Sequence, residues 1–136
     1  MNDEWREQYK RERAENNAYV QSLLEKGDFL DDDGYPTDHA CEIIAKWDNN
    51  TDSKGWFEFI HTLWHLKSWG WNEGEAIDEI TNKKAWCYYI STAGWSGNET
   101  LIHSMQKNFD LWGLNWVQSR RGGHYIFQLH TFEDDE

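Results

Sequence analysis

The stretch "AWCYYISTAGWSGNETLIHSMQKNF", residues 85–109, decides the fold class because its periodicity changes part-way along. Residues 85–92 are rich in aromatic and β-branched side chains, which is typical of a β-strand. After the polar segment "AGWSGNE", apolar residues recur at helical spacing, at Leu101, Ile102, Met105 and Phe109. The stretch therefore predicts a strand that leads directly into a helix.

Two further strands are expected after this helix. The segments "LNWVQS" and "HYIFQLH" have strand composition, and "RRGG", residues 120–123, separates them. Paired glycines supply the positive φ angles that a tight hairpin needs. We expect this hairpin, residues 115–130, to pair with the strand at 85–92, so that residues 84–131 form a β-α-β-β unit.

The first half of the chain reads as helical. Residues 3–26 predict a helix or arm that Gly27 ends, and its apolar residues gather in the second half. Pro36 and Thr37 open a second helix, whose buried stripe has i, i+3, i+4, i+7 spacing: Ala40, Ile43, Ile44 and Trp47. A third, central helix is predicted from Lys54 to Ser68. The following "SWGWNEGEAIDEITNKK" predicts an irregular bend with a short helical turn.

These elements indicate one α+β domain over residues 1–136, with N-terminal helices packed on a small antiparallel sheet of β-α-β-β order. Its parts are an N-terminal helix or arm (1–27), a helical part (35–80), the β-α-β-β part (84–131) and an acidic tail (132–136).

Composition excludes several kinds of partner. The net charge is −12, from 25 acids and 13 bases, which argues against direct binding of nucleic acid or an anionic membrane. No apolar run is long enough to span a membrane, and "MNDEWREQYK" has no signal-peptide core. Cys41 and Cys87 predict free thiols in a reducing cytosol.

One candidate anion site lies at the start of the helix that follows residue 95. Ser96 and Glu99 have the S-x-x-E spacing of a capping box. Free backbone N–H groups and the positive end of the dipole make such a helix start suitable for an anion, and Gly97 would let a ligand approach the backbone. The alternative is a well-formed helix cap without a ligand.

The second candidate is the arginine pair at the hairpin turn. Every base between residues 14 and 119 is a lysine, whereas Arg120 and Arg121 present guanidinium forks that suit phosphate or carboxylate. The alternative is a surface ion pair with one of the acids. If the two loops meet at one end of the sheet, they form a site for a nucleotide-like ligand. Its residues would be Trp95, Ser96, Gly97, Asn98, Glu99, Arg120, Arg121 and His124.

The sequence gives less support to a metal site or a catalytic nucleophile than to an anion-binding site. The acidic loop at 27–38 does not fit a calcium-binding EF-hand, because Phe29 and Ala40 would fall at ligand positions one and twelve. His61 and His65 are four residues apart, but "HTLWH" lacks the glutamate of a zinc peptidase. We expect no metal, no cofactor and no catalytic residue, with hydrolysis that uses His124, or less readily Ser96 as a nucleophile, as the enzymatic alternative.

Several of these motifs resemble motifs of a known protein family. The motifs "GWSGNE" and "RRGGHY" and the tryptophan-rich "WHLKSWGW" resemble those of a widespread, largely uncharacterised family of small bacteriophage and prophage proteins, over about residues 35–130. The resemblance implies a location in the cytoplasm of an infected bacterial host and a role as an accessory protein against host defence. It implies no mechanism.

Three hypotheses follow. The first is a binding module for a small phosphorylated or nucleotide ligand, such as a host immune signalling nucleotide that it would sequester. The second is an acidic inhibitor of a basic host nuclease or DNA-binding protein. The third is a nucleotide hydrolase that uses His124 with Glu99 or Arg121. Homo-oligomer formation is compatible with each.

Overall fold

A computed structural model of the chain describes residues 3–48 and 52–129. The predicted α+β class is confirmed: the described residues form six helices and a four-stranded antiparallel sheet. The elements are α1 (Glu4–Lys26), α2 (Asp38–Lys46), α3 (Ser53–Leu63), α4 (Lys67–Gly70), β1 (Trp71–Ile77), β2 (Lys84–Ser91), α5 (Ser96–Lys107), α6 (Phe109–Asn115), β3 (Trp116–Arg120) and β4 (His124–Gln128). Within these residues, no helix combines the length and apolar character needed to cross a membrane. The predicted acidic tail lies outside the described residues.

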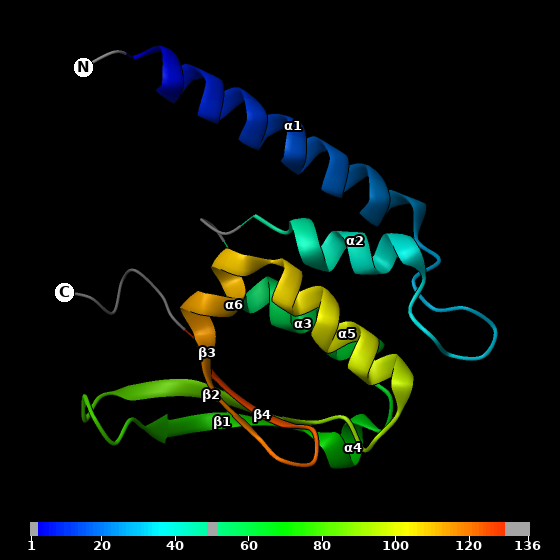
Figure 1. Ribbon diagram of the computed structural model, residues 1–136, viewed down its shortest axis with the longest axis vertical. Coiled ribbons are helices and arrows are strands. Elements are labelled where there is room, and N and C mark those ends of the chain that lie inside the picture. The colour runs from blue at the N-terminus through cyan, green and yellow to red at the C-terminus, as the bar shows by residue number, and fades with distance from the viewer. Residues whose placement is uncertain (1–2, 49–51, 130–136) are drawn as a thin grey trace.

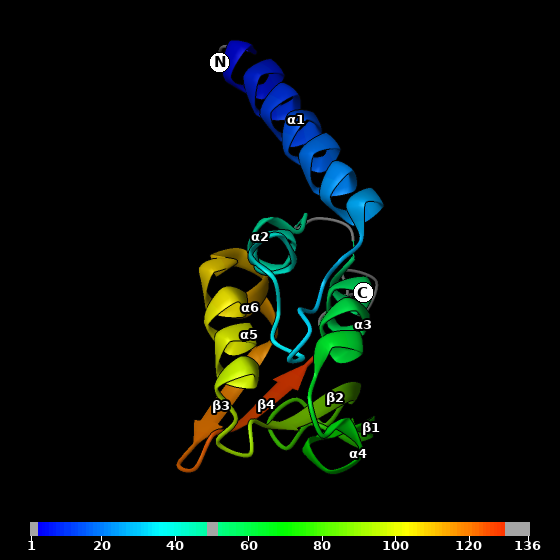
Figure 2. The ribbon, with the colours of Figure 1, turned by 90° about the vertical axis from the view of Figure 1, so that its right-hand side faces the viewer.

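The sheet has the strand order β1-β2-β4-β3, and every neighbouring pair is antiparallel. Helices α2, α3, α5 and α6 gather on one face of it (Figures 1 and 2). The other face, which we call the open face, is not covered by any of these four helices. Because side chains alternate along a strand, each residue of β2 belongs either to the core or to the open face.

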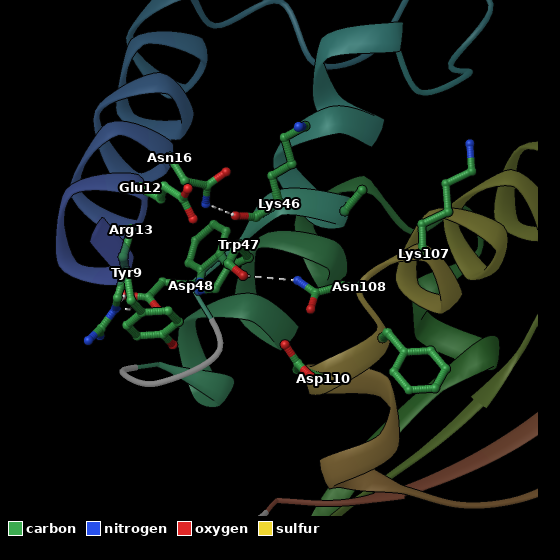
Figure 3. Close-up of a pocket in the computed structure, with 12 residues that line it drawn as sticks. Tyr9, Glu12, Arg13, Asn16, Lys46, Trp47, Asp48, Lys107, Asn108 and Asp110 are labelled. Carbon is green, nitrogen blue, oxygen red and sulfur yellow. Dashed lines mark hydrogen bonds and ion pairs between the residues drawn. The ribbon is translucent and has the colours of Figure 1, made fainter. Parts of the chain in front are cut away.

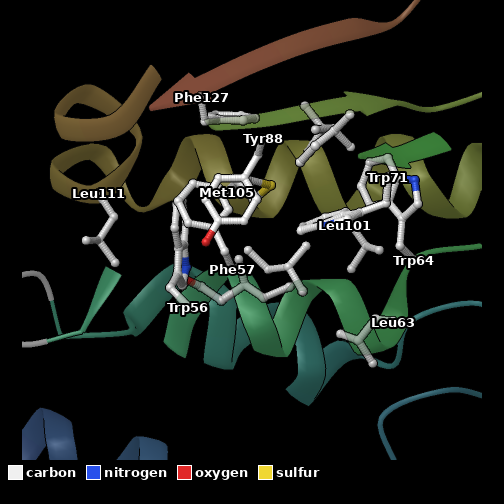
Figure 4. Packing of buried hydrophobic residues seen from close by; sticks show 14 of the residues in the cluster. Trp56, Phe57, Leu63, Trp64, Trp71, Tyr88, Leu101, Met105, Leu111 and Phe127 are labelled. Carbon is white, nitrogen blue, oxygen red and sulfur yellow. The ribbon is translucent and has the colours of Figure 1, made fainter. Parts of the chain in front are cut away.

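The core lies between the sheet and the helices, and aromatic rings fill much of it (Figure 4). Phe57 of α3 stacks on Tyr88 of β2 with ring centroids 4.1 Å apart, and Phe127 of β4 packs against Phe57 at 5.3 Å. Trp56 and Phe57 are fully buried. Truncating one such ring costs about 3–5 kcal/mol, so this layer fixes how the helices sit on the sheet.

Helix α1 confirms the predicted helix at 3–26, and Gly27 caps its end with a φ of 67°. Its C-terminal half docks through Val20 and Leu23 on Ile43 of α2. Its N-terminal end stands clear of the remaining elements (Figure 2). The long helix is therefore held by only part of its length.

The expected irregular bend at residues 68–84 is wrong, because most of this segment is strand β1 and its hairpin turn to β2, whereas the expected short helical turn is present as α4. The predicted order β-α-β-β thus becomes β-β-α-α-β-β. Strand β1 escapes pattern reading because it is an edge strand with polar residues on both faces. The hairpin turn helps to hold it, since the Asp78 carboxylate accepts hydrogen bonds from the backbone N–H groups of Thr81 and Ile80. These bonds, with one from Gln128, lower the pKa of Asp78 to about 2.

The third helix ends earlier than the predicted boundary at Ser68. Helix α3 stops at Leu63, and Leu66 adopts a left-handed conformation with a φ of 58° before α4 begins. The cause is a tertiary contact, because the Asn98 side chain binds both the N–H and the C=O of His65. Sequence periodicity carries no information about such a contact.

Candidate functional site on the open face of the sheet

A hollow of about 340 Å³ lies on the open face near the hairpin turn. Strands β2, β4 and β3 supply its lining residues: Tyr89, Ile90, Ser91, Arg120, His124, Tyr125 and Ile126. Sheet register explains the grouping. Ser91 faces His124 across β2 and β4, and His124 faces Arg120 across β4 and β3. Three polar side chains from three strands therefore stand in one row.

His124 is oriented by a hydrogen bond in which Ser91 Oγ lies 2.6 Å from its Nδ1 atom. A hydroxyl that donates to Nδ1 leaves the ring proton on Nε2. The His124 ring lies against Gly122, where an added Cβ would come 3.3 Å from Nε2. The imidazole is thus held at the turn by Ser91 and Gly122, and in the tautomer that accepts from the Ser91 hydroxyl its Nε2 atom is an N–H donor.

Arg120 lies beside His124 and keeps most of its guanidinium donors available. Its Nε donates to Gln118 Oε1 over 3.2 Å. Within residues 3–48 and 52–129, neither Arg120 nor Arg121 forms an ion pair with a carboxylate. The alternative of a hairpin-tip ion pair is therefore not observed in the part of the chain that the structure describes. A guanidinium without a carboxylate partner is suited to an external anion.

Among the residues that the structure describes, no carboxylate lines the hollow, although the chain carries 25 acids. The nearby acids of β1 point elsewhere. Glu73 lies on the helix side of the sheet, where its carboxylate accepts from Trp71 Nε1 at 2.6 Å and from Trp86 Nε1 at 3.1 Å. The hollow is thus a locally basic surface on an acidic protein, which favours an anionic ligand.

Backbone geometry explains why both residues of the turn after Arg121 are glycines. Gly122 and Gly123 have φ angles of 96° and 78°, which other residues adopt with strain. An added Cβ on Gly123 would also lie 2.3 Å from Thr92 Oγ1. The hairpin at "RRGG" is confirmed, and its glycines are explained by backbone geometry alone.

The two predicted loops do converge, because the Thr92 N–H donates to the Gly123 carbonyl over 3.0 Å. Of the predicted site residues, however, only Arg120 and His124 line the hollow. Arg121 lies exposed in the turn beside it. Trp95, Ser96, Gly97, Asn98 and Glu99 do not line it.

The start of α5 is used for packing. Trp95 stacks on Tyr35 at 4.8 Å and lies against His65 at 4.3 Å. Its ring also covers Gly97, so a Cβ on that glycine would collide with it at 2.2 Å. This close approach explains why residue 97 has no side chain.

The predicted capping box is wrong. Residue 95 is the N-cap, and no side chain there caps the helix. Ser96 instead donates to the Tyr35 hydroxyl at 3.4 Å, and Glu99 is exposed. Asn98 is fully buried, and it binds Thr92 O in addition to the backbone of His65.

A second hollow, of about 390 Å³, lies between α1, the end of α2 and the α5–α6 corner (Figure 3). One ion pair lies across it. Asp48 accepts a forked contact from Arg13, with the shortest bond 2.9 Å from Nη2. Glu12 and Asp110 add negative charge, and Lys46 and Lys107 add positive charge. We interpret this hollow as the joint that fixes α1 to the body.

His61 and His65, the two histidines considered as metal ligands, pack against different tryptophans. His61 stacks on Trp71 at 4.7 Å, and His65 lies against Trp95. Burial lowers the pKa of His61 below 6.5, which favours its neutral form. Along the described chain, no three side chains of His, Cys, Asp or Glu gather as a metal site.

Sequence reasoning missed Tyr89 and Ser91 as site residues. The available signal was the two-residue period of the predicted strand at 85–92, which places Cys87, Tyr89 and Ser91 on one face. Which face is open depends on where the helices pack, and the pattern does not specify this.

Comparisons with protein-family models, curated proteins and solved structures find no match to this chain. The resemblance to bacteriophage and prophage proteins and the interaction-inhibitor hypothesis stay predictions.

Proposed function

We propose that the protein is a binding module for a small phosphorylated or nucleotide ligand, held in the hollow on the open face. The observation that carries the proposal is the row formed by Ser91, His124 and Arg120, in which the guanidinium has no carboxylate partner within the described residues. Guanidinium and imidazole N–H groups are charge-assisted donors suited to phosphate oxygens.

In this arrangement each side chain has a distinct task. Arg120 supplies charge and the terminal N–H groups of its fork. His124 supplies the Nε2–H donor, and Ser91 holds the imidazole in that orientation through Nδ1. Gly122 and Gly123 bring the turn close enough for all three to share one surface. In an infected bacterial cell, such a module would sequester a host immune signalling nucleotide.

Calorimetric titration with pyrophosphate and with a panel of nucleotides tests the proposal. We expect Arg120→Ala to weaken binding about tenfold or more, because charge-assisted hydrogen bonds contribute about 1.5–3 kcal/mol. Arg11→Ala is the matched control, since Arg11 is an exposed arginine on α1, far along the chain from the hollow. Absence of binding by the native protein, or equal binding by both variants, would contradict the proposal.

The Ser91–His124 hydrogen bond also favours a second candidate, hydrolysis of the bound phosphate ester with His124 as a general base or acid. Product formation over time, abolished in His124→Ala, would support turnover. Stoichiometric binding without product would support the binding module.

A further inference from the structure

The open face carries one more feature next to the anion-binding row. Tyr89 stands on β2, a central strand of the sheet, and its side chain is 43% exposed. No other aromatic ring packs against it in the described part of the chain. This ring is therefore free on its outer side, unlike Trp95, whose ring is already stacked.

Tyr89 lies close to the residues proposed to bind phosphate. It lies two residues before Ser91 on the same face of β2, a separation of about 7 Å along a strand. Ile126, which faces Tyr89 across β2 and β4, extends the apolar surface under the hollow. An aromatic and apolar platform thus adjoins a cationic row, without any intervening carboxylate among the lining residues.

We infer that the ligand of this site is a mononucleotide, whose base stacks on Tyr89 while its phosphate meets Arg120 and His124. The inference rests on the proposed function and specifies its ligand class. Aromatic side chains on open sheet faces are common stacking partners for bases, and the stacking tolerates different bases because each has a π face.

Charge selects a mononucleotide over a longer strand. The hollow offers one arginine and one histidine, with Arg121 in the adjacent turn, and these suit a single phosphate group. The chain as a whole has a net charge of −12, which disfavours the many phosphate contacts that a polynucleotide needs. Burial and then the neighbouring Cys87 raise the pKa of the Tyr89 hydroxyl above its ordinary value, so Tyr89 adds no negative charge beside the phosphate-binding groups.

The test compares adenosine 5′-monophosphate with ribose 5-phosphate by calorimetry. We expect the nucleotide to bind about 5- to 100-fold more tightly, since one stacked base contributes on that scale. Tyr89→Leu should remove this preference and leave ribose 5-phosphate binding unchanged. Tyr89→Phe should keep the preference, because the ring remains. Arg120→Ala should weaken both ligands alike.

Tyr19→Leu is the matched control, because Tyr19 on α1 is also 43% exposed and lies outside the hollow. Circular dichroism verifies that each variant is folded. If Tyr89→Leu does not fold, loss of the preference in Tyr89→Phe would itself overturn the stacking role. Equal binding of both ligands, each weakened by Arg120→Ala, would overturn the inference and leave the proposed function standing. Binding of neither ligand would overturn both. Tighter binding of a single-stranded oligonucleotide than of the mononucleotide would overturn the ligand class.

Discussion

The backbone N–H of Thr92 donates a hydrogen bond to the carbonyl oxygen of Gly123 over 3.0 Å. This bond joins the loop between β2 and α5 to the turn between β3 and β4. The turn is thereby anchored at the end of the sheet instead of projecting as a free hairpin tip. Arg120 and His124 flank the anchored turn, so their relative position is fixed before any ligand arrives.

We expect Gly123→Ala to lower the free energy of unfolding by about 1–3 kcal/mol, because the residue has a positive φ angle and its Cβ would collide with Thr92. Urea denaturation measures the change. Gly74→Ala in β1 is the control, since nothing lies within 4 Å of its added Cβ and it has no positive φ. Equal stability of the two variants would contradict the anchoring argument.

Asn98→Ala should be among the more destabilising polar substitutions, with a loss of about 2–4 kcal/mol. The fully buried amide makes three hydrogen bonds to backbone groups of His65 and Thr92, and its removal leaves those groups without partners. Asn72→Ala, at an exposed position, should cost less than about 0.5 kcal/mol. Thermal unfolding followed by circular dichroism compares them, and a small effect at Asn98 would refute its role in ending α3.

Stability should fall as the pH is lowered through about 6.5, because His61 has a lower pKa in the folded protein than in the unfolded chain. Burial favours the neutral ring, so the unfolded state binds the proton more tightly. The contribution of His61 to the free energy of unfolding is therefore fully present above pH 6.5, and it is lost as the pH falls toward the pKa of the folded protein. Urea midpoints between pH 8 and pH 5 measure the slope. His61→Gln should flatten it, whereas His103→Gln, at an exposed position, should leave it unchanged.

Asp48→Ala should loosen α1 from the body and lower the free energy of unfolding by about 1–3 kcal/mol. The carboxylate accepts bonds from Arg13 and Asn17, and its side chain is largely buried. Hydrogen exchange should accelerate in the middle turns of α1, around Arg13 and Asn17. Glu58→Ala, which breaks an exposed pair with Lys54 at 4.0 Å, should change neither quantity measurably. Unchanged exchange in Asp48→Ala would show that apolar packing alone holds α1.

The sequence predicted the elements whose signals are local. Residues 3–26, the helix that Thr37 opens, the strand at 85–92 and the hairpin at "RRGG" are all confirmed. The Thr37 side chain does accept a hydrogen bond from the N–H of Ala40. In each case the signal is a capping residue, a periodic apolar pattern or a turn residue, and it lies within a few positions of the element that it predicts.

The failures lie where a distant contact overrides a local signal. Strand β1 has little apolar alternation and is held by pairing with β2. Ser96 and Glu99 have the spacing of a capping box, but α5 begins at Ser96 with Trp95 as its N-cap, and Trp95 packs on Tyr35 and His65. Similarly, the convergence of the two loops was predictable from strand order, whereas the choice of the open face and of Tyr89 required the position of the helices.

The register between β2 and β4 has a consequence for how this protein can change. Tyr88 faces Phe127 and Tyr89 faces Ile126 in the same pairing, so one alignment sets both the aromatic core and the spacing of the ligand surface. A slip of one residue would turn Tyr88 outward and Tyr89 inward, at the expense of the packing against Phe57. Selection for a stable core therefore also preserves the geometry of the binding surface. The residues on the open face can vary to suit a new ligand while the frame that spaces them stays the same.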